Sequence, residues 1–150
     1  YAAGLLHDVG LIIEDQFRHA EFIRIHEGKH RFDDNLPPSE LKVLGFDHAQ
    51  IGRRLSESWN FPVELEQCIG YHHSPKQANE DLRRSVLILY VADQLCMQEG
   101  LGFCDEPKGD RELLQDGLKE LDIKGVAAYL IVTEVVEEID RMEKQGWFLP

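Results

Sequence analysis

YAAGLLHDVGLII, at residues 1–13, is the stretch that decides how the rest of the chain is interpreted. Its apolar side chains recur at intervals of three and four, the period of an α-helix with one wide buried face. These positions are Ala2, Ala3, Leu5, Leu6, Val9, Ile12 and Ile13. The pair His7-Asp8 falls inside this predicted helix. A buried carboxylate without a partner is costly, so the pair predicts a polar group or a cation beside it.

The same helical period recurs along the chain, and no segment alternates apolar and polar residues as a strand does. Further helices are predicted over residues 17–27, 39–44, 48–59, 63–73, 82–99, 111–118 and 123–144. Gly45 is placed to end one helix in a left-handed conformation, and Asp47 to cap the next. Segments 28–38 and 100–110 contain the Gly and Pro residues of loops. The predicted fold class is all-α, a helical bundle with the apolar helix 82–99 at its centre.

Composition narrows the function classes. The 150 residues are the length of one compact domain, 1–150, and 43% of them are hydrophobic. A net charge of −12 disfavours nucleic acid as a partner, because the phosphate backbone is also negative. The longest apolar stretch, 86–96, is too short to cross a membrane. An odd set of cysteines without close pairing (Cys68, Cys96 and Cys104) fits a reducing cytoplasm. Because Tyr1 already lies inside the helical pattern, we expect helices upstream of it.

Residues with metal-ligating side chains stand in four separate segments. They are His7, Asp8, His48, His72, His73 and Asp93. Imidazole and carboxylate together suit divalent ions such as Fe, Mn, Zn or Ni, and ligands from separate helices can converge inside a bundle. Neighbouring ligands on one helix could contact one ion or two. Such an ion would activate a water and polarise a phosphoryl oxygen, which is the chemistry of a phosphate-ester hydrolase.

Other interpretations of these residues remain open at the level of sequence. His7 and Asp8 can form a hydrogen-bonded pair that only fixes helix packing. Asp93 can form an ion pair with an arginine such as Arg83. Cys68 and His72 have the i, i+4 spacing of a zinc pair, although a core cysteine beside a histidine at a helix end is the commoner arrangement.

Five motifs carry a family resemblance. They are GLLHDVG (4–10), FDHAQIGRRL (46–55), WNFP (59–62), IGYHHSP (69–75) and VLILYVADQL (86–95). As an ordered set they resemble the HDOD family, the "HD-related output domain", which is similar to the HD superfamily of metal-dependent phosphohydrolases. The resemblance implies an HD-domain-like helical bundle that lacks its upstream helices here. It also implies a bacterial signalling domain whose partners are other signalling domains or its own upstream segment.

Enzymes of the superfamily that carry a Gly-Tyr-Pro motif hydrolyse cyclic di-GMP. By resemblance, all six residues named above match their metal-ligand positions. The chain departs from these enzymes at two points: Leu11 replaces a lysine that contacts substrate phosphate, and Ser74-Pro75 follows His73 in place of Gly-Tyr-Pro. We therefore expect a signalling module with a retained metal site. The alternative is a phosphohydrolase that acts on a nucleotide or cyclic dinucleotide.

Overall fold

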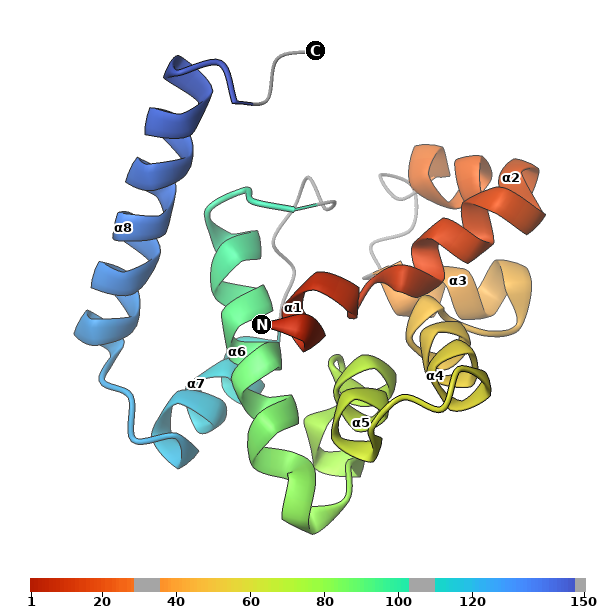
Figure 1. Cartoon of the computed structure of the whole chain (residues 1–150), viewed down its shortest axis with the longest axis horizontal. Coiled ribbons are helices and arrows are strands. Elements are labelled where there is room, and N and C mark those ends of the chain that lie inside the picture. The colour runs from red at the N-terminus through yellow and green to blue at the C-terminus, as the bar shows by residue number, and fades with distance from the viewer. Residues whose placement is uncertain (29–35, 103–109, 148–150) are drawn as a thin grey trace. The chain divides into compact units, whose positions relative to one another are not determined.

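The computed structural model describes residues 1–28, 36–102 and 110–147. These residues form helices joined by turns and contain no strand, which confirms the all-α prediction (Figure 1). None of the helices in these three ranges is long and apolar enough to cross a membrane. The chain divides into two compact units, Tyr1–Tyr90 and Val91–Pro150, which are described separately below. The prediction of a single domain over 1–150 stays a prediction.

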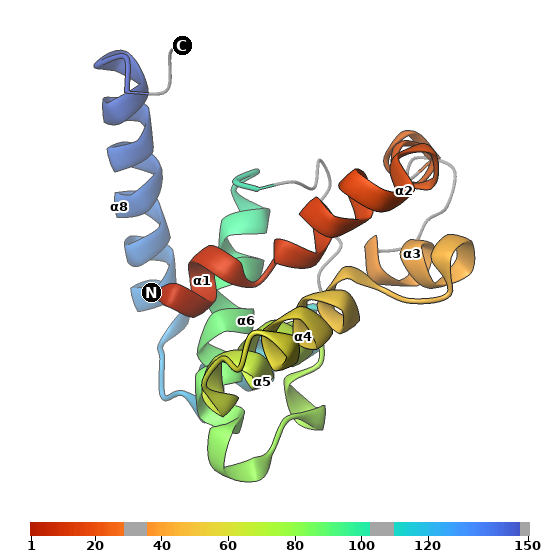
Figure 2. The ribbon, with the colours of Figure 1, turned by 45° about the vertical axis from the view of Figure 1, so that its right-hand side comes forward.

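The first unit contains most of the five sequence motifs quoted above. Its elements are α1 (Ala2–Leu6), α2 (Val9–Gly28), α3 (Leu36–Leu44), α4 (His48–Ser58), α5 (Val63–Tyr71), η1 (Pro75–Gln77), η2 (Glu80–Leu82) and the beginning of α6 (Arg83–Gln98). Helix α4 packs against both α2 and α5, and α3 contacts α2 and α4. Both views show α4 beside α5 (Figures 1 and 2). Helix α4 is therefore the element that joins α2, α3 and α5.

The predicted first helix is interrupted at His7 and Asp8, which form a turn between α1 and α2. The expectation that this pair lies inside one continuous helix is wrong. A continuous helix would use the Gly4 carbonyl as acceptor for the backbone N–H of Asp8. Instead, the Nδ1–H of His7 donates to that carbonyl over 2.9 Å. A second irregularity follows at Arg18, whose φ of −136° and ψ of 42° kink α2.

Two glycines allow the helices of this unit to approach closely. A Cβ atom on Gly10 would lie 2.0 Å from the backbone carbonyl oxygen of His48, so only glycine fits at that position of α2. A Cβ atom on Gly52 would lie 2.7 Å from Cγ2 of Ile69. These contacts seat α4 directly against α2 and α5, and they fix the position of His48 at the beginning of α4.

The local signals around α3 and α4 are mostly confirmed. Gly45 has a φ of +84°, the left-handed conformation expected of a helix C-terminus. The side chain of Asp47 accepts a 2.8 Å hydrogen bond from the backbone N–H of Gln50, as an N-cap does. However, α3 begins at Leu36 and not at Ser39. Two prolines occupy its first turn, where proline is tolerated. The rest of the predicted loop, 29–35, lies outside the described residues.

Apolar side chains from several elements fill the interior of the first unit. Cys68 packs there with Ala78, Val86 and Leu89. The open choice between a zinc-binding and a core cysteine is thereby decided for the core, since Cys68 is not among the residues whose ligand atoms converge. Helix α6, predicted over 82–99, buries Val86 completely.

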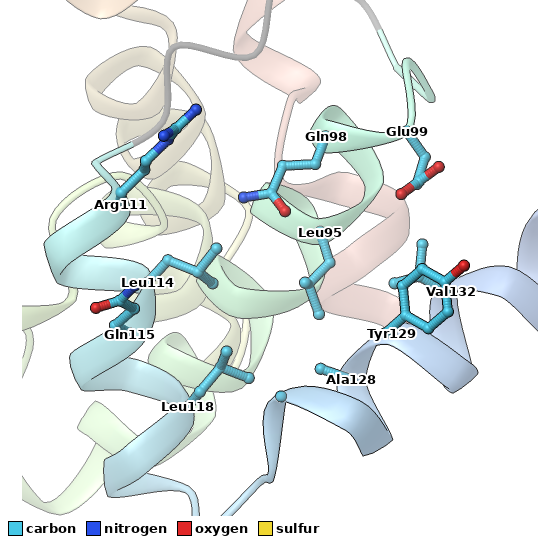
Figure 3. Close-up of a pocket in the computed structure, with 11 residues that line it drawn as sticks. Leu95, Gln98, Glu99, Arg111, Leu114, Gln115, Leu118, Ala128, Tyr129 and Val132 are labelled. Carbon is cyan, nitrogen blue, oxygen red and sulfur yellow. The ribbon is translucent and has the colours of Figure 1, made fainter.

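The second unit consists of the end of α6, α7 (Arg111–Glu120) and α8 (Gly125–Lys144), close to the predicted ranges. Its buried side chains are Val91, Gln94, Leu114, Leu121, Ala128 and Val132. A pocket opens between the three helices of this unit, and Leu95, Leu118 and Tyr129 are among the residues that line it (Figure 3). This unit carries Asp93.

Candidate metal centre

Four side chains converge at one point of the first unit: Asp8, His48, His72 and His73. One ligand atom of each lies within 4.8 Å of the corresponding atom of the other three. Nε2 of His48 is 3.4 Å from Nε2 of His72 and 2.9 Å from Nε2 of His73. Oδ1 of Asp8 is 3.4 Å from Nε2 of His48 and 3.5 Å from Nε2 of His72. We call these four residues the His/Asp cluster.

Every member of the His/Asp cluster stands at the end of a helix. Asp8 lies in the turn between α1 and α2, His48 is the first residue of α4, and His72 and His73 follow α5. These junctions meet because α4 packs on both α2 and α5, and Gly10 allows the first of these contacts. The packing of three helices therefore builds the cluster from residues that are far apart in the sequence.

The spacing of the cluster fits one small divalent ion. In a tetrahedral zinc site with bonds of 2.0–2.1 Å, neighbouring ligand atoms are about 3.3 Å apart. The four separations given above range from 2.9 to 3.5 Å. Three imidazole nitrogens and one carboxylate oxygen form a donor set that first-row divalent ions accept. By donor chemistry and by spacing, these residues fit the metal that the sequence predicts.

Burial strengthens the electrostatic interactions between the side chains of the cluster. The side chains of His48 and His72 are 1% and 0% exposed, whereas Asp8 is 40% exposed. Burial raises the pKa of Asp8, but hydrogen bonds from His48, His7 and His72 hold that pKa well below its usual range. Asp8 is therefore a carboxylate at neutral pH and supplies the negative charge that a cation needs.

The pKa values of His48 and His73 shift in opposite directions. Burial lowers the pKa of His48, but the neighbouring Asp8 and Glu40 carboxylates raise it to about 10. Burial and the neighbouring His72 and His48 rings hold the pKa of His73 well below its usual range. A proton on His48 thus occupies the place of a cation in the metal-free protein, and a bound metal would displace that proton.

Hydrogen bonds behind the cluster orient two of its rings. Nδ1–H of His48 donates to the Glu40 carboxylate, whose oxygens lie 2.8 and 2.9 Å away, and the backbone N–H of His48 donates to the same carboxylate over 2.9 Å. Nδ1–H of His72 donates to the Ile69 carbonyl over 2.7 Å. Because Nδ1 is engaged in both rings, Nε2 is the nitrogen that each ring presents to the cluster.

Sequence reasoning missed Glu40, which is 0% exposed. Its spacing from apolar neighbours offered a signal: Leu36, Val43 and Leu44 stand at i−4, i+3 and i+4 on the same helical face. A glutamate on an apolar face needs a partner. That partner, His48, lies on another helix and could be found only in three dimensions.

A second buried glutamate, Glu14, is close to Glu40. It is 1% exposed, and neither of its oxygens has a hydrogen-bond partner. Burial, followed by the charge of Glu40, raises the pKa of Glu14 to about 8. At neutral pH Glu14 therefore holds its proton.

The remaining two predicted ligands have different positions. Nε2 of His7 lies 3.2 Å from Oδ2 of Asp8, the oxygen other than the one nearest His48 and His72, so His7 flanks the cluster without belonging to it. Asp93 is half-buried on α6 in the second unit. Its role as a ligand stays a prediction.

The sequence and the fold of this chain are similar to those of known proteins. The model of the HDOD domain family matches residues 1–75. An uncharacterized protein of Treponema pallidum (strain Nichols) is 31% identical over 85 residues, which are 55% of this chain and 16% of that protein. An HDOD domain protein of unknown function from Geobacter sulfurreducens has a similar structure, with a TM-score of 0.71 and 24% identity over 93% of this chain and 50% of its own. The chain thus spans half or less of either relative. The family match across half of the sequence and the shared helical fold together mean that the chain belongs to the HDOD domain family.

Proposed function

We propose that this chain is a signal-transduction output module in which the His/Asp cluster holds one divalent metal ion as a regulatory or structural centre. The convergence of Asp8, His48, His72 and His73 carries this proposal, because their ligand atoms are spaced for a single ion. Such an ion would tie the turn between α1 and α2 to the ends of α4 and α5. Its binding or loss would change how firmly these three junctions are held together.

Two features favour a regulatory centre over a hydrolytic one. Four protein ligands occupy every coordination position of a tetrahedral ion, whereas a catalytic zinc site usually keeps one position open for water or substrate. In addition, Leu11 stands where the cyclic di-GMP hydrolases carry a phosphate-binding lysine, and its side chain is buried. Removing a cationic contact from a developing phosphate charge removes transition-state stabilisation.

Nearby arginines are already engaged by carboxylates. Nε of Arg53 lies 3.2 Å from both Glu57 and Glu66, and Nη1 of Arg54 lies 3.2 Å from Glu57. A free arginine beside the cluster could guide an anionic substrate toward it. In ion pairs, each has part of its charge neutralised, which weakens that role.

The partners in this proposal are other signalling domains, or a further segment of the same protein. They would read the conformation of the first unit, and no substrate would be turned over. A cytoplasmic location of the protein would suit such partners, and it is part of the same proposal.

The test is the metal content of the purified chain. Elemental analysis should find about one equivalent of a divalent first-row metal per chain after dialysis against trace zinc, iron, manganese or nickel, as expected for one four-ligand site. His48→Ala should lose this metal. His19→Ala is the matched control, because His19 is an exposed histidine paired with Asp15 outside the cluster. Equal metal content in the two variants would refute the proposed site.

A metal-dependent phosphohydrolase acting on a nucleotide or cyclic dinucleotide is the second candidate. One observation favours it: Asp8 is 40% exposed, so the cluster has an edge that faces solvent. A second ion would need further ligands, such as His7 beside Asp8. Incubation of the metal-loaded chain with cyclic di-GMP and with bis(p-nitrophenyl) phosphate separates the two functions. Product release that disappears in His48→Ala would establish the hydrolase and overturn the regulatory proposal.

A further inference from the structure

We propose that Glu40 is the positioning residue of this centre: it sets the orientation and the protonated nitrogen of His48, so that Nε2 points into the cluster. The inference rests on the proposed function, because it concerns the same centre. It adds a residue that neither the family motifs nor the ligand pattern contains. It also predicts that a side chain that contacts no metal controls metal affinity.

The first argument is the double contact between the two residues. The Glu40 carboxylate accepts from the Nδ1–H of His48 and also from the backbone N–H of the same residue. One carboxylate thus holds the ring and the main chain of His48 together. With both points fixed, rotation of the ring about its side-chain bonds would break at least one hydrogen bond.

The second argument is the position of His48 in its helix. His48 is the first residue of α4, and backbone N–H groups in the first helical turn have no partner within the helix. The Asp47 side chain caps the N–H of Gln50 and leaves the N–H of His48 to another acceptor. Glu40 supplies that acceptor from α3. The contact therefore joins α3 to the N-terminus of α4, where a negative charge is also favoured by the helix dipole.

The third argument is burial. Glu40 and His48 are 0% and 1% exposed, so water does not compete for their hydrogen bonds. Without Glu40, Nδ1 of His48 would be left buried without an acceptor, and the ring would gain by turning Nδ1 toward Asp8. That rotation would withdraw Nε2 from its place near His72 and His73.

Glutamine at position 40 is the informative substitution. It keeps the size of the side chain but replaces one carboxylate oxygen with an NH2 donor. Both oxygens of Glu40 lie within 2.9 Å of Nδ1 of His48, so in either orientation that NH2 group would face the Nδ1–H donor. Glu66→Gln is the control, because Glu66 is a largely buried glutamate that accepts a hydrogen bond from Arg53 and not from a histidine. Glu40→Asp keeps the charge and shortens the reach, so it serves as a second variant should the glutamine variant not fold.

The direct readout is NMR on the full 150-residue chain. In the wild type, the backbone amide and the Nδ1–H proton of His48 should exchange slowly and resonate downfield. Both should exchange faster in Glu40→Gln and keep their protection in Glu66→Gln. This measurement needs no metal. Unchanged protection of both protons in Glu40→Gln would overturn the inference.

The second readout is metal affinity, measured by titration with Co²⁺ and Zn²⁺. Loss of a hydrogen-bond partner behind a ligating histidine typically lowers metal affinity about 10- to 100-fold. We expect a loss of that size and an altered Co²⁺ absorption spectrum in Glu40→Gln, with wild-type behaviour in Glu66→Gln. Wild-type affinity in Glu40→Gln would overturn the positioning role and leave the proposed metal site standing. Absence of metal from the wild type would instead refute the proposed function, and the exchange data would then decide the orienting role of Glu40 alone.

Discussion

The α-carbon of Gly10 faces the main chain of His48 so closely that a Cβ atom there would lie 2.0 Å from the His48 carbonyl oxygen. Helix α2 and the beginning of α4 thus meet backbone to backbone. Asp8 is two residues before this contact, so the distance between Asp8 and His48 depends on it. The packing of two helices and the geometry of the cluster are the same structural fact.

Gly10→Ala should therefore destabilise the fold and weaken the cluster together. Overpacking of this kind costs about 1–3 kcal/mol, and backbone atoms cannot move aside as a flexible side chain can. Gly4→Ala is the control, because a Cβ atom on Gly4 meets nothing within 4 Å. Urea unfolding measures the loss, and zinc titration measures the effect on the cluster. Equal stability of the two variants would contradict the close approach.

Metal removal should lower the stability of the chain. An ion that binds only the folded state stabilises it by about 2.7 kcal/mol when its free concentration is 100 times Kd. We expect the melting temperature to rise with added Zn²⁺ and to fall after EDTA treatment. His72→Ala should abolish this response, since His72 is a completely buried member of the cluster. A melting temperature that changes with neither zinc nor EDTA would argue against the site.

Glu14 should make stability depend on pH. Its pKa is raised from 4.5 to about 8 in the folded chain by burial and by Glu40. A raised pKa contributes stability that is fully present below pH 4.5 and is lost as the pH rises through 8, because the folded state binds the proton more tightly than the unfolded state does.

Glu14→Gln removes this dependence. Relative to the wild type, the variant should gain on the order of 2–4 kcal/mol between the acid and alkaline ends of this range. Denaturant unfolding at a series of pH values measures the difference. Glu80→Gln, at an exposed glutamate, is the control and should follow the wild type. A constant difference between wild type and Glu14→Gln across this range would show that Glu14 keeps an ordinary pKa.

Asp47→Ala should weaken the beginning of α4. The Asp47 side chain caps the N–H of Gln50, and loss of such a cap costs typically about 1 kcal/mol. His48 follows directly, so fraying of this turn should also lower zinc affinity. Asp47→Ser retains a capping oxygen and should recover most of the loss, which chemical denaturation and zinc titration can measure. If Asp47→Ser lost as much stability as Asp47→Ala, the Asp47 charge would have a role other than capping.

Much of the local structure was encoded in short stretches of sequence. Helical spacing of apolar residues predicted the helices, and Gly45 and Asp47 marked the boundary between α3 and α4. Residue chemistry together with the family motifs singled out candidate metal ligands, four of which converge in the structure. These features are local because backbone sterics, capping hydrogen bonds and side-chain periodicity act within a few residues.

The long-range relationships appeared only in the tertiary structure. Helix packing brought Asp8 and three histidines from distant segments to one point, placed His7 beside that point, and set Glu40 behind His48. The break between α1 and α2 likewise depends on a side chain competing with the helix for the Gly4 carbonyl. One sequence pattern fits several such arrangements, because the spacing of residues along a helix fixes the face on which they lie but not the helix that packs against that face.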